Sequence, residues 1–324
     1  MRRCGHPDGR GLPCSGPRRI QDHLQRPAAM CPGRGPGREA ADDSRPAREA
    51  LPRPRVSAPT NPDALASLAE GCLDGRAALV TGGGSGIGRA TAVLLARLGA
   101  RVAVTGRREE QLAETVSIIE GAGGHALAVS CDVREPDEVD AMLDTVLAAF
   151  GGIDILVNNA GGQFVSPAEA ISHKGFRAVT RLNLDATWYV STQVAARSMI
   201  PNGYGKIASV TMTPRRGMPG MAHSSAARAA VESLTRTWAV EWAAKGIRTL
   251  AVAPGIVHTD AWERYGLEPD QTAKVVPMGR LQAADEVAAM IGFFASPAGD
   301  YITGQTFVVD GGLDLAGPGQ SLTS

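Results

Sequence analysis

In the stretch VTGGGSGIGRA at 80–90, three of the glycines, Gly82, Gly86 and Gly88, stand where a chain can approach a phosphate closely. These glycines lie between a short apolar run and a segment with helical periodicity. Glycine permits the sharp turn that such an approach requires, and the first N–H groups of the following helix carry a partial positive charge. The spacing predicts a binding loop for the pyrophosphate of a dinucleotide. The residues predicted to form it are Gly82, Ser85, Gly86, Ile87 and Gly88.

Two arginines follow the second apolar run, RVAVTG at 101–106, and they indicate which dinucleotide binds. An acidic residue at the end of this run would receive the ribose 2′-hydroxyl of NAD(H). The chain has Thr105 there, followed after one glycine by Arg107 and Arg108. A guanidinium can pair with a 2′-phosphate through two hydrogen bonds. The pattern favours NADP(H), and the alternative is that both arginines are solvated surface charges.

The elements that must position these groups alternate regularly from about residue 74 to residue 312. Seven apolar runs are continuous, which is typical of strands buried on both faces. Strands that alternate with helices form a parallel sheet with right-handed crossovers. We therefore expect an α/β fold, a Rossmann-like doubly wound parallel sheet of about seven strands in a single domain. The runs are 76–82, 101–106, 125–133, 153–161, 205–210, 247–255 and 305–312.

Residues 1–60 differ in composition from the rest of the chain. They hold 12 arginines against 6 acidic residues, and 10 of the 21 prolines, without an apolar period. We expect a disordered tail there and one domain over 61–324. The remainder is mildly acidic, which gives no reason to expect nucleic-acid binding. The chain has no apolar run long enough to cross a membrane, and no cysteine spacing typical of a metal site. We therefore expect a cytoplasmic protein with reduced cysteines.

Further motifs follow the glycine loop in chain order, and together they resemble the short-chain dehydrogenase/reductase family. They are CDV (131–133), NNAG (158–161), RLNLDA (181–186), PGIVHT (254–259) and VVDGG (308–312). The resemblance covers about residues 74–312 and implies a nicotinamide cofactor and an active-site asparagine, Asn183. It also implies cofactor contacts from Asp132, Val133, Asn159, Ala160, Gly161, Pro254, Gly255, Val257 and Thr259.

The family's catalytic pair is replaced in this chain. Most members open the long helix after the fifth strand with Tyr-x-x-x-Lys, where the tyrosine exchanges a proton and the lysine holds the ribose. Ser224 and Arg228 stand in those places, and no tyrosine occurs between 205 and 264. The family's serine place is Met212 by counting forward from the strand and Thr211 by counting back. We favour Thr211 because it keeps a hydroxyl.

This replacement changes the chemistry that the site can catalyse. Reduction of an isolated ketone needs a strong proton donor, whereas hydride addition to a C=C conjugated to a thioester produces an enolate. Preorganised donors can stabilise an enolate oxygen without giving up a proton. We expect Asn183, Thr211 and Ser224 to organise this oxyanion site. Arg228 cannot relay protons, but it can hold the ribose hydroxyls.

Three segments are similar to one branch of the family, that of peroxisomal trans-2-enoyl-CoA reductase and 2,4-dienoyl-CoA reductase. They are 161–176, 223–229 and 301–312. These relatives also carry Ser in place of the tyrosine. The dienoyl-CoA reductases have a tyrosine in the preceding loop, where this chain has Pro214, so the monoenoyl reductase is the closer match. The resemblance implies an NADPH-dependent reductase of an acyl thioester or enone that forms a homodimer or homotetramer.

Two other functions stay open. One is a carbonyl or alcohol oxidoreductase of the same fold, similar to a 3-ketoacyl reductase, with its acid recruited elsewhere. His223 can supply such an acid near neutral pH, although a residue at a helix entry more often packs. The other is a catalytically silent NADP-binding sensor or scaffold. The segment 258–279 is expected to be a substrate lid, because it follows the PGIVHT motif and shows no clear apolar periodicity.

Overall fold

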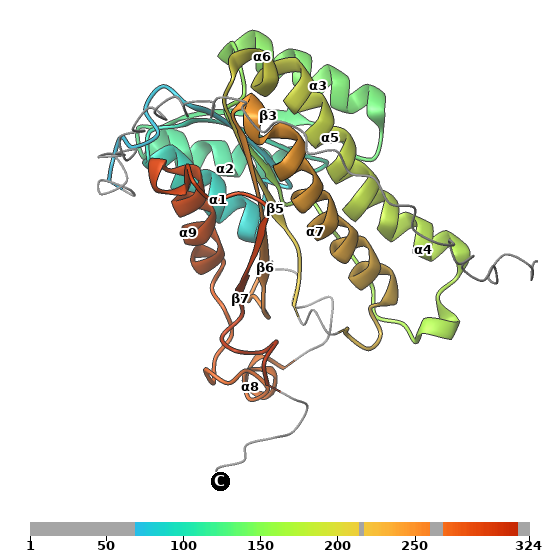
Figure 1. Ribbon diagram of the computed structural model, residues 1–324. Coiled ribbons are helices and arrows are strands. Elements are labelled where there is room, and N and C mark those ends of the chain that lie inside the picture. The colour runs from blue at the N-terminus through green and yellow to red at the C-terminus, as the bar shows by residue number, and fades with distance from the viewer. Residues whose placement is uncertain (1–68, 214–216, 260–267, 317–324) are drawn as a thin grey trace, which may run out of the picture. The chain divides into compact units, whose positions relative to one another are not determined.

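The computed structural model describes residues 69–213, 217–259 and 268–316, and both the expected tail at 1–60 and Pro214 lie outside these ranges. Parallel strands form one sheet in the order β3-β2-β1-β4-β5-β6-β7, which confirms the predicted Rossmann-like fold (Figure 1). The strands are β1 (Ala77–Thr81), β2 (Arg101–Gly106), β3 (His125–Ser130), β4 (Ile155–Asn158), β5 (Gly205–Val210), β6 (Ile247–Pro254) and β7 (Gln305–Val309).

Helices cover both faces of the sheet, and each face has its own apolar core. Helices α1, α2 and α9 pack on one face, where Leu95, Leu112 and Phe294 are buried. Helices α3, α5 and α7 pack on the other, with Leu143 and Trp238 among the buried residues (Figure 1). The helices are α1 (Gly86–Arg97), α2 (Glu109–Gly121), α3 (Pro136–Phe150), α4 (His173–Thr180), α5 (Ala186–Val194), α6 (Ile200–Asn202), α7 (Ala222–Trp242), α8 (Pro269–Ala273) and α9 (Ala284–Ala295).

The order of the strands explains where a ligand can bind. The chain passes from β1 outward to β2 and β3, and then returns to place β4 on the other side of β1. The connections therefore diverge at the carboxyl ends of β1 and β4, where open α/β sheets bind their ligands. The glycine loop follows β1 and the NNAG motif begins in β4, so the topology brings both predicted cofactor motifs to this point.

The segment from α4 to α6 is one helical path with two wider turns. A π turn at Arg181–Asp185 joins α4 to α5, and another at Ala195–Met199 joins α5 to α6. Such turns often occur at functional sites, because the extra residue re-aims nearby side chains. The first of them contains Asn183, the asparagine expected in the active site. Within the part of the chain that the structure describes, no helix is long and apolar enough to cross a membrane.

Candidate active site

A cavity of about 650 Å³ opens where the chain leaves the carboxyl ends of β1, β2, β3, β4, β5 and β6. It brings together most of the residues that the sequence singles out. Those lining it are Gly82, Ser85, Gly86, Ile87, Arg107, Arg108, Asp132, Val133, Asn159, Ala160, Gly161, Thr211, Arg228, Pro254, Gly255, Val257 and Thr259. Gly88, Asn183 and Ser224 are not in this lining, and each acts on the cavity through a neighbour, as described below.

The glycine loop has the shape that a phosphate requires. Gly82 and Gly86 adopt left-handed φ values of +64° and +51°, which favour glycine. A Cβ at Gly88 would lie 2.2 Å from the Gly82 carbonyl oxygen, so helix α1 packs directly against the loop. The N-terminal N–H groups of α1 therefore face the cavity end at which the loop turns. These features fit the pyrophosphate of a nicotinamide dinucleotide.

Asn159 holds this loop from the neighbouring strand. Its Nδ2 donates to the carbonyl oxygens of Thr81 at 3.0 Å and Gly82 at 3.1 Å. The Thr81 hydroxyl in turn accepts the backbone N–H groups of Asn159 and Ala160 at 3.0 and 3.1 Å. The sequence predicted Asn159 as a residue that lines the cofactor. The structure adds that its amide ties the end of β1 to the end of β4.

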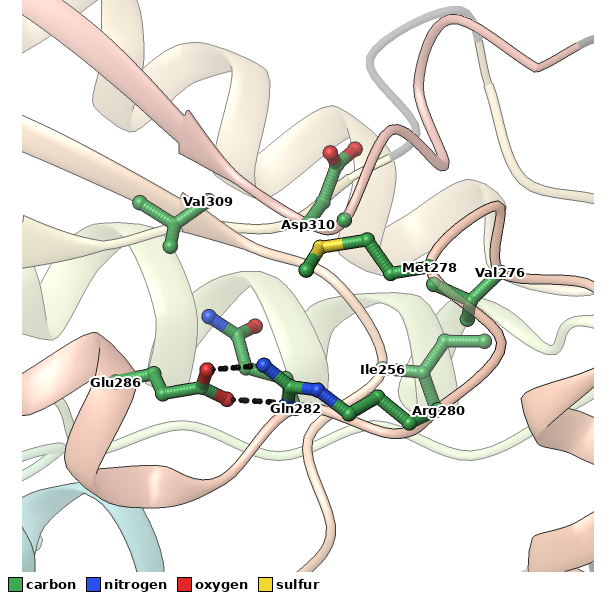
Figure 2. A pocket seen from close by; sticks show the side chains of 9 residues that line it. Ile256, Val276, Met278, Arg280, Gln282, Glu286, Val309 and Asp310 are labelled. Atoms are coloured by element: carbon green, nitrogen blue, oxygen red, sulfur yellow. Dashed lines mark hydrogen bonds and ion pairs between the residues drawn. The ribbon is translucent and has the colours of Figure 1, made fainter.

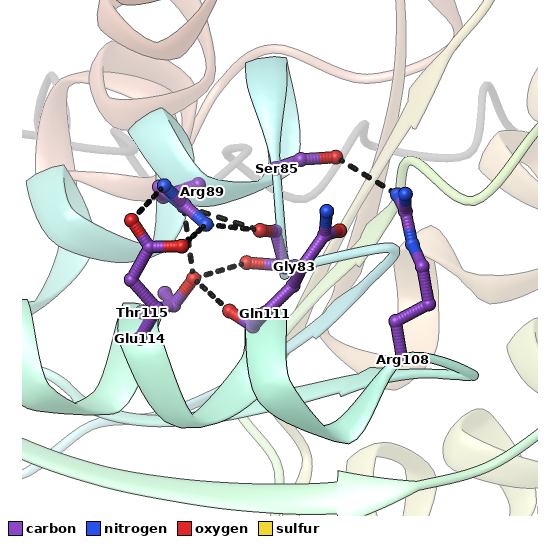
Figure 3. Close-up of polar contacts among 8 residues, drawn as sticks. Gly83, Ser85, Arg89, Arg108, Gln111, Glu114 and Thr115 are labelled. Atoms are coloured by element: carbon purple, nitrogen blue, oxygen red, sulfur yellow. Dashed lines mark hydrogen bonds and ion pairs between the residues drawn. The ribbon is translucent and has the colours of Figure 1, made fainter. Parts of the chain in front are cut away.

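Arg89 is a further support of the loop that the sequence analysis missed. Its guanidinium donates to the Gly84 carbonyl and pairs with both carboxylate oxygens of Glu114, at 2.6 and 2.9 Å (Figure 3). Thr115 adds a hydrogen bond of 3.0 Å to the Gly83 carbonyl. These contacts fix the outside of the loop to α2. No sequence motif signalled the ion pair, because Arg89 and Glu114 lie 25 positions apart.

The groups after β2 and β3 surround the end of the cavity at which the sequence analysis expects the adenosine of the cofactor. Thr105 is buried and donates to the Val129 carbonyl at 2.8 Å, so no acid occupies the end of β2. Arg108 reaches the Ser85 hydroxyl at 3.5 Å (Figure 3). Asp132 pairs with Arg134, whose hydrogen bonds hold the pKa of this carboxyl below its usual value. This end of the cavity therefore carries two lining arginines, Arg107 and Arg108, and one carboxylate, Asp132, whose charge is paired with Arg134.

Ser224, at the start of α7, is fully buried beside the cavity. Its hydroxyl donates to Gln163 Oε1 at 3.2 Å and lies 3.6 Å from the Met212 sulfur. The Thr211 hydroxyl instead contacts the Val252 carbonyl oxygen at 3.3 Å and a carboxylate of α7 at 3.5 Å. The structure thus brings Met212 against Ser224, whereas the Thr211 hydroxyl is engaged at the sheet.

Asn183 acts on the loop that follows β4. Its Nδ2 donates to the carbonyl oxygens of Gly162 at 2.7 Å and Val179 at 2.9 Å, and its Oδ1 accepts the Gly162 N–H at 3.2 Å. Both ends of the amide therefore hold Gly162, the neighbour of Gln163. Gln163 lines the cavity and bonds Ser224, so it belongs to the site although the sequence analysis did not select it. Its place directly after NNAGG was the available signal.

Arg228 brings a fixed positive charge to the inner wall of the cavity. One guanidinium nitrogen donates to the Val210 carbonyl at the end of β5. Another would lie 2.5 Å from a Cβ at Gly161, so only glycine lets the loop after β4 lie this close. The side chain therefore spans the ends of β4 and β5. Because guanidinium stays protonated below a pH of about 12, this charge does not depend on pH in the physiological range.

His223 is fully buried and links α7 to the same loop. Its Nδ1 accepts the Ser224 backbone N–H at 2.7 Å, and its ring packs edge-to-face on Phe164 with 4.3 Å between centroids. Burial lowers the pKa of this imidazole, and a hydrogen bond with the Phe164 backbone opposes part of that shift. The ring is therefore neutral at pH 7, with Nδ1 engaged as an acceptor.

The PG segment, which comprises residues 254–259 (PGIVHT), closes the far side of the cavity. Gly255, Val257 and Thr259 line it after β6, and Thr259 Cγ2 would lie 3.1 Å from a Cβ at Gly86. The segment thus reaches from the sheet to the phosphate loop. Residues 260–267 of the expected lid lie outside the described part of the chain, and the remainder of 258–279 includes the short helix α8.

Comparison with known proteins is consistent with this geometry. Residues 82–314 match the family model described as enoyl-(acyl carrier protein) reductase. A probable 2,4-dienoyl-CoA reductase of Bacillus subtilis is 40% identical over 74% of this chain and 97% of its own length. A 3-oxoacyl-[acyl-carrier-protein] reductase of Synechocystis is also 40% identical, over 74% of this chain and 98% of its own length.

A solved structure agrees in both fold and sequence. The citronellol catabolism dehydrogenase AtuB of Pseudomonas aeruginosa is 42% identical, with a TM-score of 0.69 over 76% of this chain and 97% of its own. The family match and these relatives, together with the sheet order and the glycine-rich loop after β1, identify the chain as an oxidoreductase of the nicotinamide-dependent class. The chain belongs to the short-chain dehydrogenase/reductase family, and its relatives include the dienoyl-CoA reductase branch.

Proposed function

We propose that this oxidoreductase reduces the conjugated C=C of an enoyl thioester with NADPH. One observation carries the proposal: the family's tyrosine place holds Ser224, which is buried between Gln163 and Met212. A site arranged in this way offers neutral hydrogen-bond donors rather than a phenol. Such donors suit a developing enolate better than an alkoxide that must be protonated. The dienoyl-CoA reductase named among the relatives supports the same choice.

Arg107 and Arg108 support NADPH as the cofactor. Both line the adenosine end of the cavity, and Thr105 leaves the end of β2 without a repelling carboxylate. A 2′-phosphate would gain charge-assisted hydrogen bonds from these guanidinium groups, each worth roughly 1.5–3 kcal/mol. The glycine loop and the start of α1 would hold the pyrophosphate. Arg228 would hold the hydroxyls of the nicotinamide ribose.

In the proposed reaction, NADPH held by the glycine loop and Arg228 would supply the hydride that adds to the β-carbon of the substrate. The Gln163 amide, whose oxygen accepts the Ser224 hydroxyl, would then donate from its nitrogen to the thioester oxygen as negative charge develops on it. Asn183 positions Gln163 by holding Gly162 from both sides. The nearby Arg228 charge stabilises the same oxyanion electrostatically. The α-carbon takes up a proton from water, which completes the reduction.

Ketone reduction is the second candidate, and the 3-oxoacyl-[acyl-carrier-protein] reductase at 40% identity favours it. In that reaction the oxygen must receive a proton from the protein. His223 is the titratable group nearest in sequence to Ser224, but its Nδ1 already accepts a backbone hydrogen bond. Burial also favours its neutral form, which is a poor acid. The geometry therefore supports the enolate pathway more strongly.

Stopped-flow oxidation of NADPH separates these candidates. The substrates are two enoyl thioesters, trans-2-decenoyl-CoA and 2,4-decadienoyl-CoA, and two ketones, acetoacetyl-CoA and 5-ketogluconate. We expect turnover of an enoyl or dienoyl thioester to exceed that of both ketones by at least tenfold. Turnover of ketones alone would reject the proposal. Tight NADPH binding without turnover of any substrate would favour a silent sensor instead.

We also propose that the protein works as a homodimer or homotetramer. Helices α5 and α7 carry large exposed apolar side chains, Trp188 at 48% and Val240 at 85%. Such residues favour burial against another copy. Multi-angle light scattering of the purified protein tests this assembly, and a monomeric mass at micromolar concentration would contradict it.

A further inference from the structure

Gln282 holds the PG segment through three hydrogen bonds. Its side-chain Oε1 accepts the Gly255 N–H at 3.1 Å. Its backbone N–H donates to the Ile256 carbonyl at 2.9 Å, and its carbonyl accepts the His258 N–H at 2.8 Å. These contacts form a short parallel bridge centred on Val257. One residue thus fixes the path of the chain from the end of β6 to the cavity wall.

Gln282 is itself anchored to the start of α9. Arg280 pairs with both carboxylate oxygens of Glu286, at 2.8 and 2.5 Å, and Glu286 also accepts the Ala283 N–H at 2.8 Å (Figure 2). Gln282 and both partners of this ion pair, Arg280 and Glu286, border a small cavity of about 90 Å³. Helix α9 packs along α1, the helix of the phosphate loop. The bridge therefore connects the PG segment to the part of the fold that carries the phosphate site.

The PG segment is also confined from the opposite side. A Cβ at Gly255 would lie 2.8 Å from the Cα of Asp310, so the backbone there is pressed against the end of β7. The Gly255 N–H donates to the Val309 carbonyl at 3.0 Å as well as to Gln282. Asp310 thus fixes one face of the segment, and Gln282 fixes the other.

We infer that Gln282 is a positioning residue for the nicotinamide end of the cofactor. Gly255, Ile256, Val257 and Thr259 all line the cavity, and each lies within the segment that the bridge holds or directly after it. The inference rests on the proposed cofactor site. Gln282 does not line that cavity, so it acts only by setting where these residues lie. Its effect must therefore fall on the nicotinamide half and leave the adenosine half unchanged.

The expected effect follows from the hydrogen bond that a substitution removes. In Gln282→Met the side chain keeps its length but loses the acceptor. The Gly255 N–H retains Val309 as a partner, so the loss is that of one ordinary hydrogen bond rather than of an orphaned donor. Such a bond contributes about 0.5–1.5 kcal/mol. We therefore expect the Kd of the intact cofactor to rise roughly threefold to tenfold.

The experiment compares the whole cofactor with its adenosine half. Isothermal titration gives Kd for NADPH and for adenosine 2′,5′-bisphosphate in the wild type and in Gln282→Met. If the wild type prefers NADH, then NADH and ADP replace this pair. Gln305→Met is the matched control, since it makes the same change at an exposed position at the start of β7, away from the carboxyl ends of the strands where the cavity lies. A thermal melt of each variant measures the effect on the fold.

A rise in Kd for NADPH alone, absent from Gln305→Met, supports the inference. An equal rise for both ligands would overturn it, because a general loss of structure weakens both halves. An unchanged NADPH affinity would overturn it as well. The outcome does not depend on turnover: a protein that reduces no enoyl thioester refutes the proposed function but leaves this comparison of affinities intact.

Discussion

Replacing Gly88 with alanine tests whether the phosphate loop needs glycine for space. Gly88 lies in the first turn of α1 and its φ is not left-handed, so alanine suits its backbone conformation. The obstacle is steric, since the new Cβ would lie 2.2 Å from the Gly82 carbonyl oxygen and 2.4 Å from Asn159 Nδ2. These two atoms are hydrogen-bonded to each other at 3.1 Å. The methyl group would therefore push apart the loop and the side chain that holds it.

The magnitude follows from how far these atoms must move. Real Cβ atoms essentially never approach a heavy atom closer than 3.0 Å, so the Gly82 carbonyl must shift by most of an ångström. Overpacking of this kind costs about 1–3 kcal/mol of unfolding free energy. For a domain of this size, that loss lowers Tm by roughly 2–12 °C. Because the shift occurs in the loop itself, NADPH affinity must fall by more than tenfold.

Gly121→Ala is the matched control. Gly121 ends α2, and a Cβ there would meet nothing within 4 Å. Alanine at such a site raises the free energy of unfolding by about 0.4–1 kcal/mol, because it reduces the conformational freedom of the unfolded chain. Thermal melts and NADPH titrations of both variants provide the measurement. A Gly88→Ala protein that binds NADPH within twofold of the wild type would refute the steric argument, whatever its Tm.

Three further outcomes are expected. Arg107→Ala raises the Kd for NADPH about tenfold or more but leaves that for NADH unchanged, since only the 2′-phosphate loses a charged partner; an unaltered preference contradicts the NADPH proposal. Gln163→Leu lowers kcat for enoyl thioester reduction about a hundredfold, as loss of an oxyanion donor does, with little change in the Kd for NADPH; steady-state kinetics decides. Arg280 lowers the pKa of Glu286 to about 2, so this carboxylate stabilises the fold above its unfolded pKa of about 4.3 and loses that effect as pH falls toward 2. Glu286→Gln therefore lowers Tm by about 2–4 °C at pH 7, a small effect because the pair is partly exposed, and the gap from the wild type narrows below pH 4 and closes near pH 2.

The fold was predictable because its signals are local. Continuous apolar runs such as Ala77–Thr81 can be buried only inside a sheet covered on both faces, and the structure buries that strand completely. Glycines after the first run indicate the phosphate turn in the same direct way. The π turn around Asn183 left no comparable signal. Its residues have ordinary helical character.

The site was less predictable because its contacts depend on side-chain direction. Counting along the sequence left Thr211 and Met212 as alternatives, and the preference for a hydroxyl selected Thr211. In the structure, the Thr211 hydroxyl contacts the Val252 carbonyl oxygen on β6, whereas the Met212 sulfur lies beside Ser224. Adjacent residues beyond a strand point in different directions, so a shift of one position exchanges their surroundings. Gln163 was missed for a related reason, since its partner Ser224 is 61 positions away.

The replaced pair now has a physical interpretation that its sequence alone did not provide. A Tyr/Lys pair works by moving a proton, which requires groups whose charge changes during the reaction. Arg228 keeps its charge and is held between the Val210 carbonyl and Gly161, so it is fixed in both position and protonation. Ser224 is equally constrained by Gln163. Groups of this kind can stabilise negative charge where it forms, but they do not carry protons. The arrangement is therefore better matched to enolate stabilisation than to carbonyl protonation.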